Sequence, residues 1–200
     1  MVGSVSIDVR PATADRWSDV VTVFGRRGED PSWCWCQTFL RSEHATPSAA
    51  ELPPDNRGAL YEEITHAAVA PGLIAYVDDH PVGWTRVGLR RAFPGVRGNR
   101  ALARVLTEED AGVWWVTCFV VDSRHRRSGV GSALLQAAVE YARERGATAV
   151  EGHPVDVAAL KAARVAGSAI YTGTLAMFAA AGFVEVDRTY ASRPVMRLLI

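Results

Sequence analysis

The chain has 200 residues, of which 48% are hydrophobic and 22% charged, a composition typical of a folded globular protein and unlike that of disordered or collagen-like chains. Its 22 basic and 22 acidic residues balance, so no global field would draw the molecule to nucleic acid or to an anionic membrane. A chain of this length predicts one domain over residues 1–200, with a core that needs no metal or disulfide support.

The cysteines and the lengths of the apolar runs indicate in which cellular compartment the protein is expected. Cys34, Cys36 and Cys118 are too few and too unevenly placed for a disulfide framework, so a reducing, cytoplasmic location is the simpler expectation. The first residues show no basic stretch followed by an apolar one, and no apolar run of about 18 residues appears. We therefore expect neither secretion nor a membrane partner.

Hydrophobic periodicity predicts a β-then-α beginning. Strands are expected over residues 5–10, 73–77 and 82–89, and helices after an N-cap at Thr13 and over 57–68. Residues 25–56 are irregular and predict a wall or lid. The arginine-rich segment 90–106 predicts a long solvated connection rather than a nucleic-acid surface, because aromatic side chains for stacking are almost absent.

The second half alternates strands and helices. Residues 113–121, VWWVTCFVV, are apolar on both faces, as a central strand covered by helices should be. Helices are expected over 129–145, 156–166 and 172–181, and strands over 148–151, 183–188 and 195–200. This order predicts an α/β protein with a central mixed sheet and helices on both faces.

A loop with two glycines joins the central strand to the amphipathic helix after it. The segment reads Arg126-Arg127-Ser128-Gly129-Val130-Gly131-Ser132. Glycines let successive N–H groups point into one concavity, and the first turn of a helix adds unpaired N–H groups, so a phosphate is the natural guest. GxxxxGK[ST] and GxGxxG do not fit this loop. The plainer alternative is that the glycines only let a helix start close to a strand.

These residues resemble a known family. Phe119-Val120-Val121 followed by Arg126-x-x-Gly129-x-Gly131 is similar to the signature of the GNAT superfamily of CoA-dependent N-acyltransferases. The similarity extends along the chain to the Ala-Gly-Phe that ends the last helix. It implies a fold in which the fourth strand carries a bulge and splays from the fifth, leaving a wedge between them.

The resemblance also implies a cosubstrate and a reaction. Acetyl-CoA would lay its pyrophosphate on the loop amides and its pantetheine arm along the central strand, and no metal is implied. The expected coenzyme-binding residues are Phe119, Val120, Val121, Arg126, Arg127, Ser128, Gly129, Val130, Gly131 and Ser132. An acetyl or other short acyl group would pass directly to an amine of a small molecule or a protein. The alternative is a non-catalytic CoA-binding sensor or interaction module.

The sequence departs from the family pattern at the proton donor. Family members often carry a tyrosine where this chain has Phe178. The catalytic residues expected in its place are Tyr171 as acid and Glu151, at the end of an apolar strand beside the wedge, as base. Cys118 and His153 are weaker candidates. Glu151 could instead pair with an arginine, and Cys118 could be a small buried hydrophobe.

Four further segments lie outside the motif. Trp33-Cys34-Trp35-Cys36 has too few ligands for a metal site and predicts core packing, with Trp33 or Trp35 lining an acceptor pocket as the second reading. Arginines of the basic segment could also meet the 3′-phosphate of CoA. Residues 156–170 are expected to shape the acceptor side, and the exposed closing strand to allow a homodimer.

Overall fold

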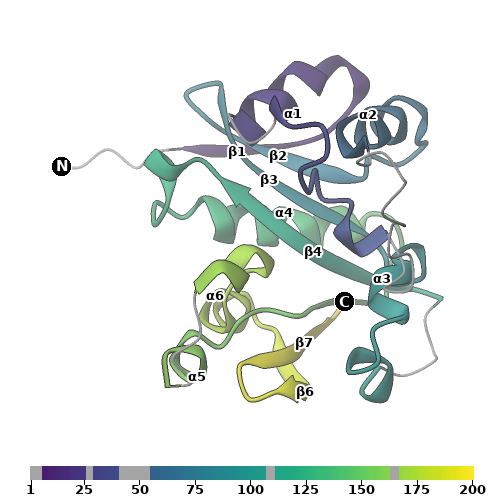
Figure 1. The fold of residues 1–200 in the computed structure, drawn as a ribbon, viewed down its shortest axis with the longest axis vertical. Helices are drawn as coiled ribbons and strands as arrows, with labels where there is room; N and C mark the ends of the chain where they lie inside the picture. The colour runs from purple at the N-terminus through teal and green to yellow at the C-terminus, as the bar shows by residue number, and fades with distance from the viewer. Residues whose placement is uncertain (1–5, 26–28, 41–54, 107–110, 163–166) are drawn as a thin grey trace.

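A seven-stranded mixed sheet organises the molecule (Figure 1). The computed structural model describes residues 6–25, 29–40, 55–106, 111–162 and 167–200. The strand order is β1-β2-β3-β4-β5-β7-β6, and only the β4–β5 pair is parallel. The strands are β1 (Ile7–Pro11), β2 (Gly72–Val77), β3 (His80–Leu89), β4 (Val113–Val121), β5 (Ala149–Gly152), β6 (Val184–Tyr190) and β7 (Arg193–Leu199).

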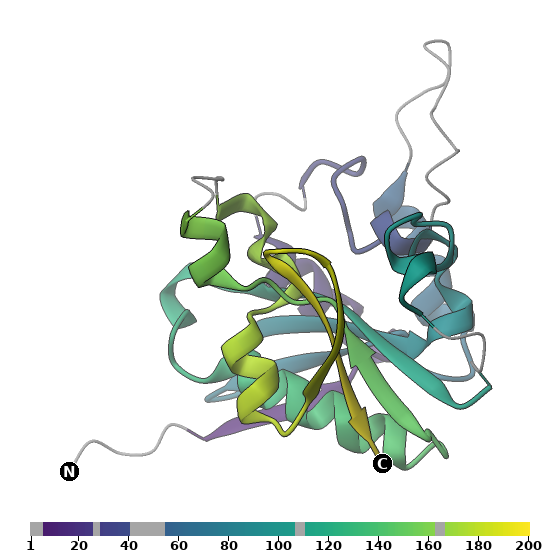
Figure 2. The same cartoon turned by 90° about the horizontal axis from the view of Figure 1, so that it is seen from below.

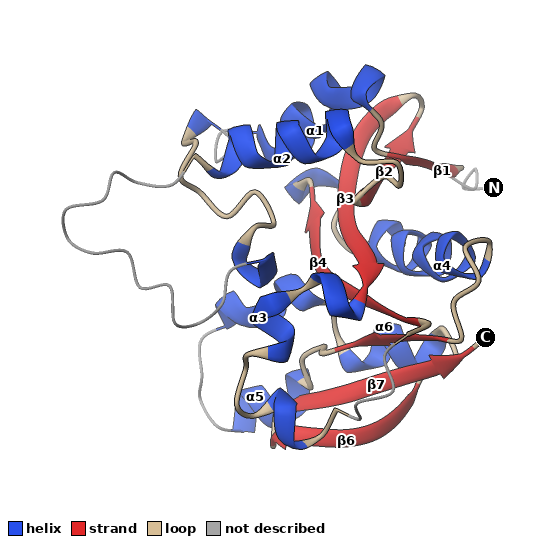
Figure 3. Ribbon diagram, turned by 90° about the vertical axis from the view of Figure 1, so that its right-hand side faces the viewer, coloured by secondary structure: helices blue, strands red, loops and turns tan. Residues whose placement is uncertain are grey.

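Helices cover both faces of the sheet, as predicted. Figure 3 shows α1 (Trp17–Phe24) and α2 (Asn56–His66) on one side and α4 (Val130–Arg143) on the other. The smaller α-helices are α3 (Pro94–Arg97), α5 (Val157–Ala162) and α6 (Leu175–Ala180). The 3₁₀ turns are η1 (Ala14–Arg16), η3 (Thr38–Leu40), η4 (Arg90–Ala92), η5 (Leu102–Arg104), η6 (Ser123–His125) and η7 (Gly167–Thr172). No helix among the described residues has the length and apolarity needed to cross a bilayer.

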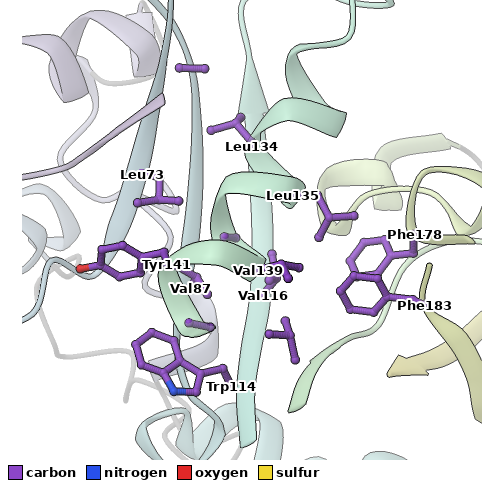
Figure 4. Close-up of a cluster of buried hydrophobic side chains, with 14 of the residues drawn as sticks. Leu73, Val87, Trp114, Val116, Leu134, Leu135, Val139, Tyr141, Phe178 and Phe183 are labelled. Carbon is purple, nitrogen blue, oxygen red and sulfur yellow. The ribbon is translucent and has the colours of Figure 1, made fainter. Parts of the chain in front are cut away.

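The main core lies between α4 and the sheet (Figure 4). Leu134 and Leu135 of α4 are fully buried, and each contributes about 1.5–3 kcal/mol by leaving water. Phe178 and Phe183 flank the same cluster with ring centroids 4.9 Å apart. This core fixes the start of α4, and with it the glycine loop, against the end of β4.

A bulge and an unequal strand length open the sheet beside β4. Arg86 pairs with Cys118 and Val87 with Val116, so Thr117 is an extra residue on β4. The β4–β5 pairing stops at Val116 and Gly152, whereas β4 continues to Val121. Residues 117–121 thus pair with no described strand on that side, and the wedge between the fourth and fifth strands is confirmed.

The hairpin of β6 and β7 closes the other edge of the sheet. Figure 2 shows it in yellow, running past α6. Val184 and Tyr190 of the edge strand β6 are more than 60% exposed. Such an edge can add another strand, and the expected homodimer stays a prediction.

Three sequence predictions need correction. The expected helix over 172–181 is interrupted because Gly173 has φ +84° and the Thr174 side chain caps α6, which starts at Leu175. The connection 90–106 is not simply solvated, since it contains η4, α3 and η5 and buries Arg90. Cys118 is not just a small hydrophobe, because it forms a disulfide with Cys36.

Candidate functional site

The glycine loop presents backbone donors at the end of β4. Gly129 is the residue before α4 and has φ +92°, a left-handed conformation that glycine adopts without strain. No described residue accepts a hydrogen bond from the backbone N–H groups of residues 126–132. The first turn of an α-helix leaves its N–H groups without intrahelical partners and carries a partial positive charge. The loop is therefore built to receive an anion.

Side-chain charge reinforces these donors. Arg126 and Arg127 are exposed, and within the described residues neither forms an ion pair. The carboxylate of Asp122, four residues before Arg126, is paired with Arg124, whose guanidinium lies 3.0 Å from it. Hydrogen bonds from Arg124 lower the pKa of Asp122 to about 2. Two uncompensated cations thus flank the donor loop.

The loop forms one wall of a cleft of about 710 Å³. Its floor is the open part of β4, and the opposite wall comes from η7 and α6. The lining residues are Trp33, Phe119, Val120, Val121, His125, Arg126, Arg127, Gly129, Gly131, Ser132, Ile170, Tyr171, Gly173, Thr174 and Met177. Strand, loop and helix wall therefore meet at one site although about 50 residues separate them along the chain.

All expected coenzyme-binding residues except two line this cleft. Val130 is 1% exposed and packs in the core beneath α4. Ser128 is exposed, and its hydroxyl donates to the carbonyl of His125 at 2.6 Å. Both residues shape the loop without facing the cleft.

Sequence reasoning missed most of the α6 wall. A Cβ on Gly131 would lie 3.2 Å from Sδ of Met177, so these residues are close neighbours across the cleft. The signal for Met177 is its position directly before Phe178, but a helix pattern alone did not tell which wall it would join. His125, Gly173 and Thr174 were also missed, because no sequence pattern indicates that they face the cleft.

Phe178 fills the wedge itself. Its ring is fully buried, and a Cβ on Gly152 would lie 2.5 Å from Cε1 of Phe178, so only glycine fits there. The ring also meets Phe119 edge-to-face, with centroids 6.4 Å apart. Ser132, Thr174 and Tyr171 are the hydroxyl-bearing residues in the lining of the cleft, and Tyr171 is 44% exposed. Phe39 lies beside the Tyr171 ring.

Glu151 lies apart from the lining of the cleft. It is fully buried, Arg90 Nη1 donates to its Oε2 at 2.5 Å, and Arg197 Nε donates to its Oε1 at 2.6 Å. Because both carboxylate oxygens accept from arginines, the geometry supports the ion-pair alternative for Glu151. Its catalytic role stays a prediction.

His153 also lies outside the lining. Its Nε2 is 2.7 Å from the Thr189 hydroxyl. Burial, and secondarily the charge of Arg193, lower the pKa of His153 to about 4, so the ring is neutral at pH 7. Arg193 in turn donates from Nη1 to the Thr172 hydroxyl at 3.0 Å, next to Tyr171.

The two tryptophans that the sequence singled out lie in different surroundings. Trp35 is fully buried in the core, as the first reading expects, whereas Trp33 lines the cleft, and contact of Trp33 with an acceptor stays a prediction. Within the described part of the chain no group of three metal-ligating side chains gathers.

Contact between the basic segment and the 3′-phosphate of CoA stays a prediction, and the segment lies at the end of β4 opposite the glycine loop. Residues 90–106 follow β3 and precede β4, whereas the loop follows the far end of β4, a separation of about 30 Å for nine residues of strand. Arg86 and Arg90 are buried and paired with Glu63 and Glu151 instead.

Comparison with known proteins gives a consistent picture. The model of the acetyltransferase (GNAT) family matches residues 33–167, and no curated protein sequence matches the chain. Among solved structures, a ribosomal-protein-alanine N-acetyltransferase from Brucella melitensis has 17% identity and a TM-score of 0.53, covering 96% of this chain and 99% of that one.

Two further structures were solved with ligands. A putative acetyltransferase from Salmonella typhimurium with acetyl-CoA has 14% identity and a TM-score of 0.52, covering 96% of this chain and 93% of that one. The aminoglycoside acetyltransferase AAC(6')-Ib in complex with coenzyme A has 17% identity and a TM-score of 0.53, covering 97% and 95%. At these identities the similarity shows the fold.

Proposed function

The chain belongs to the acetyltransferase (GNAT) family, and from that premise we propose that it transfers an acetyl or other short acyl group from acyl-CoA to an amine. The observation that carries the proposal is the donor loop at residues 126–132, which has unused N–H groups and two free arginines beside an open strand. Neither feature serves the packing of the core. Both suit a diphosphate attached to an extended chain.

The cleft has the volume and the polar groups to hold the extended pantetheine arm of the coenzyme. From the loop, the floor runs along residues 119–121 of β4, which have no β5 partner. Alternate residues of an unpaired strand edge expose N–H and C=O groups, so an extended pantetheine arm can hydrogen-bond there as a further strand would. The Salmonella typhimurium relative carries acetyl-CoA, which supports this assignment.

The proposed reaction is direct. A neutral amine attacks the thioester carbon, an oxyanion develops on the carbonyl oxygen, and the CoA thiolate leaves as the C–S bond breaks. Holding the two reactants in a near-attack geometry supplies on the order of 7–11 kcal/mol in favourable cases. N–H groups of the open β4 edge are the donors available to the oxyanion.

We assign the protonation of the leaving thiolate to Tyr171. Phe178, at the position where relatives often carry tyrosine, has no hydroxyl and is fully buried. Thr174 also lines the cleft, but its hydroxyl accepts from Met177 N–H as a helix cap. The phenol of Tyr171 is partly exposed and lines the same cleft, which makes it the better placed acid.

The test follows thiol release from acetyl-CoA with a panel of amines that includes small molecules, aminoglycosides and peptide N-termini. Calorimetry of CoA binding runs beside it. Turnover on at least one amine supports the enzyme. CoA binding without turnover on any amine favours the sensor, and absence of binding contradicts both.

A further inference from the structure

The Cys36–Cys118 disulfide connects the segment that carries Trp33 to β4, the strand that forms the floor of the cleft. Cys36 lies in the segment between α1 and α2, three residues after Trp33, and Cys118 directly precedes Phe119. Trp33 and Phe119 both line the cleft. Hydrogen bonds from Asn56 Nδ2 to the carbonyls of Ser32 and Trp33 attach this segment to α2, and one from Trp84 Nε1–H to Cys36 Sγ attaches it to β3. The disulfide is therefore its covalent attachment to β4.

Cys36 and Cys118 are buried in an apolar cluster, which by itself disfavours thiolates, but each has a neighbour that favours one. Trp84 is fully buried, and its Nε1–H donates to Cys36 Sγ at 3.1 Å. Arg86 is directly opposite Cys118 in the β3–β4 register, so their side chains share one face of the sheet. Arg86 is 1% exposed, and its Nη2 pairs with Glu63, whereas its Nε and Nη1 have no hydrogen-bond partner among the described residues.

A buried guanidinium with two unused donors is costly unless an anion comes near. A thiolate at Cys118 would be such an anion, and a positive neighbour makes a thiol a better leaving group in disulfide exchange. These donors therefore favour the reduced state of the pair, opposing the gain from the cross-link. A pair balanced in this way can respond to its redox surroundings.

We propose that Cys36 and Cys118 form a redox-modification site whose reduction weakens the binding of acyl-CoA; this rests on the proposed function. A dithiol reductant supplies the two electrons. One of its thiolates attacks a sulfur of the disulfide and expels the other cysteine as a thiolate, and its second thiolate then breaks the mixed disulfide. The products are two cysteine thiols, after protonation, and the oxidised reductant.

Reduction acts on the cleft through Trp33. Without the cross-link, the segment that carries Trp33 stays on α2 but loses its covalent attachment to the strand that carries Phe119. The distance between Trp33 and Phe119 then varies, and the coenzyme has to restore that distance when it binds. We expect the affinity for acetyl-CoA to fall at least fivefold.

The experiment compares the full chain equilibrated with oxidised or reduced dithiothreitol. Maleimide labelling after denaturation, read by mass spectrometry, counts thiols, and calorimetry gives the Kd of acetyl-CoA in each state. Wild type should show one labelled thiol when oxidised and three when reduced, with at least fivefold weaker binding after reduction. The matched control Cys34→Ser, which removes the free cysteine, should respond in the same way.

The double variant Cys36→Ser/Cys118→Ser should bind with the reduced affinity under both conditions. If it does not fold, the reduced wild type still gives the comparison. Three labelled thiols in the oxidised protein, or an affinity that ignores the redox state, would overturn the inference while leaving the proposed function standing. No binding in either state would overturn the proposed function and, with it, the control of affinity.

Discussion

Replacing Glu151 by glutamine separates the two roles considered for this residue. The amide keeps the size of the carboxylate but removes its charge. In the structure that charge is shared by Arg90, which is 1% exposed, and Arg197, whose side chain is 26% exposed. The substitution leaves Arg90 buried beside a neutral group.

The expected loss of stability follows from the burial of Arg90. Removing one partner of a buried ion pair costs about 3–5 kcal/mol, because the buried cation loses the charge of that partner. The amide oxygen still accepts one hydrogen bond, so we expect the low end, about 3 kcal/mol. For a chain of this length this corresponds to a decrease in Tm of roughly 6–12 °C.

The assay measures urea unfolding and Tm at pH 7, and kcat well below the Tm of the variant. We expect the loss of stability with kcat within a few-fold of wild type. Glu140→Gln, which breaks an exposed pair with Arg143, is the matched control and should change stability little. Full stability with a kcat loss of about 10²–10⁴ would refute the ion-pair reasoning and make Glu151 a general base.

Three further predictions use different readouts. Tyr171→Phe should lower kcat on the order of 10²-fold with the Kd of CoA unchanged, whereas the exposed Tyr190→Phe should match wild type; an unchanged kcat would remove Tyr171 as the acid. Because the pKa of His153 is lowered to about 4 in the folded state, the unfolded chain binds its proton first, so wild type should lose up to about 3 kcal/mol of stability as the pH falls from 6.5 to 4. His153→Gln should lack that part of the loss, and parallel pH profiles would contradict it. Cys36→Ser/Cys118→Ser removes a cross-link between residues 82 positions apart, and the loss of chain-entropy stabilisation should lower the free energy of unfolding by up to about 4.5 kcal/mol. Urea unfolding measures this loss, and equal midpoints for oxidised wild type and variant would refute it.

The elements next to the cleft were predictable because their signals are local. The apolar run over 113–121 gives the limits of β4 without error, since a strand covered on both faces excludes polar residues. The glycine loop was predictable because Gly129 needs a left-handed conformation where the strand turns into the helix.

The rest depends on contacts between distant parts of the chain. Arg90 and Glu151 are 61 residues apart, and Cys36 and Cys118 are 82 residues apart. Spacing along a sequence carries no information on such pairs, so Arg90 was read as solvated and Cys118 as a simple hydrophobe. Likewise, the periodicity of the last helix did not reveal the interruption at Gly173, because the spacing of apolar residues carries no information on the backbone angle φ.

The proposed acyl transfer requires the loop amides to hold the diphosphate of the acyl donor, and Gly131→Glu would disrupt that contact. Gly131 lies in the first turn of α4 with φ in the ordinary helical range, and its new Cβ would meet only the flexible end of Met177. The fold should therefore tolerate the change while the carboxylate repels the phosphates. Gln136→Glu, on the exposed face of the same helix, is the charge-matched control.

The measurement is a calorimetric titration of CoA into the three proteins, with Tm recorded for each. We predict that wild type and Gln136→Glu bind CoA with similar Kd and that folded Gly131→Glu does not bind. Undiminished binding by a folded Gly131→Glu variant would contradict the assignment of the loop.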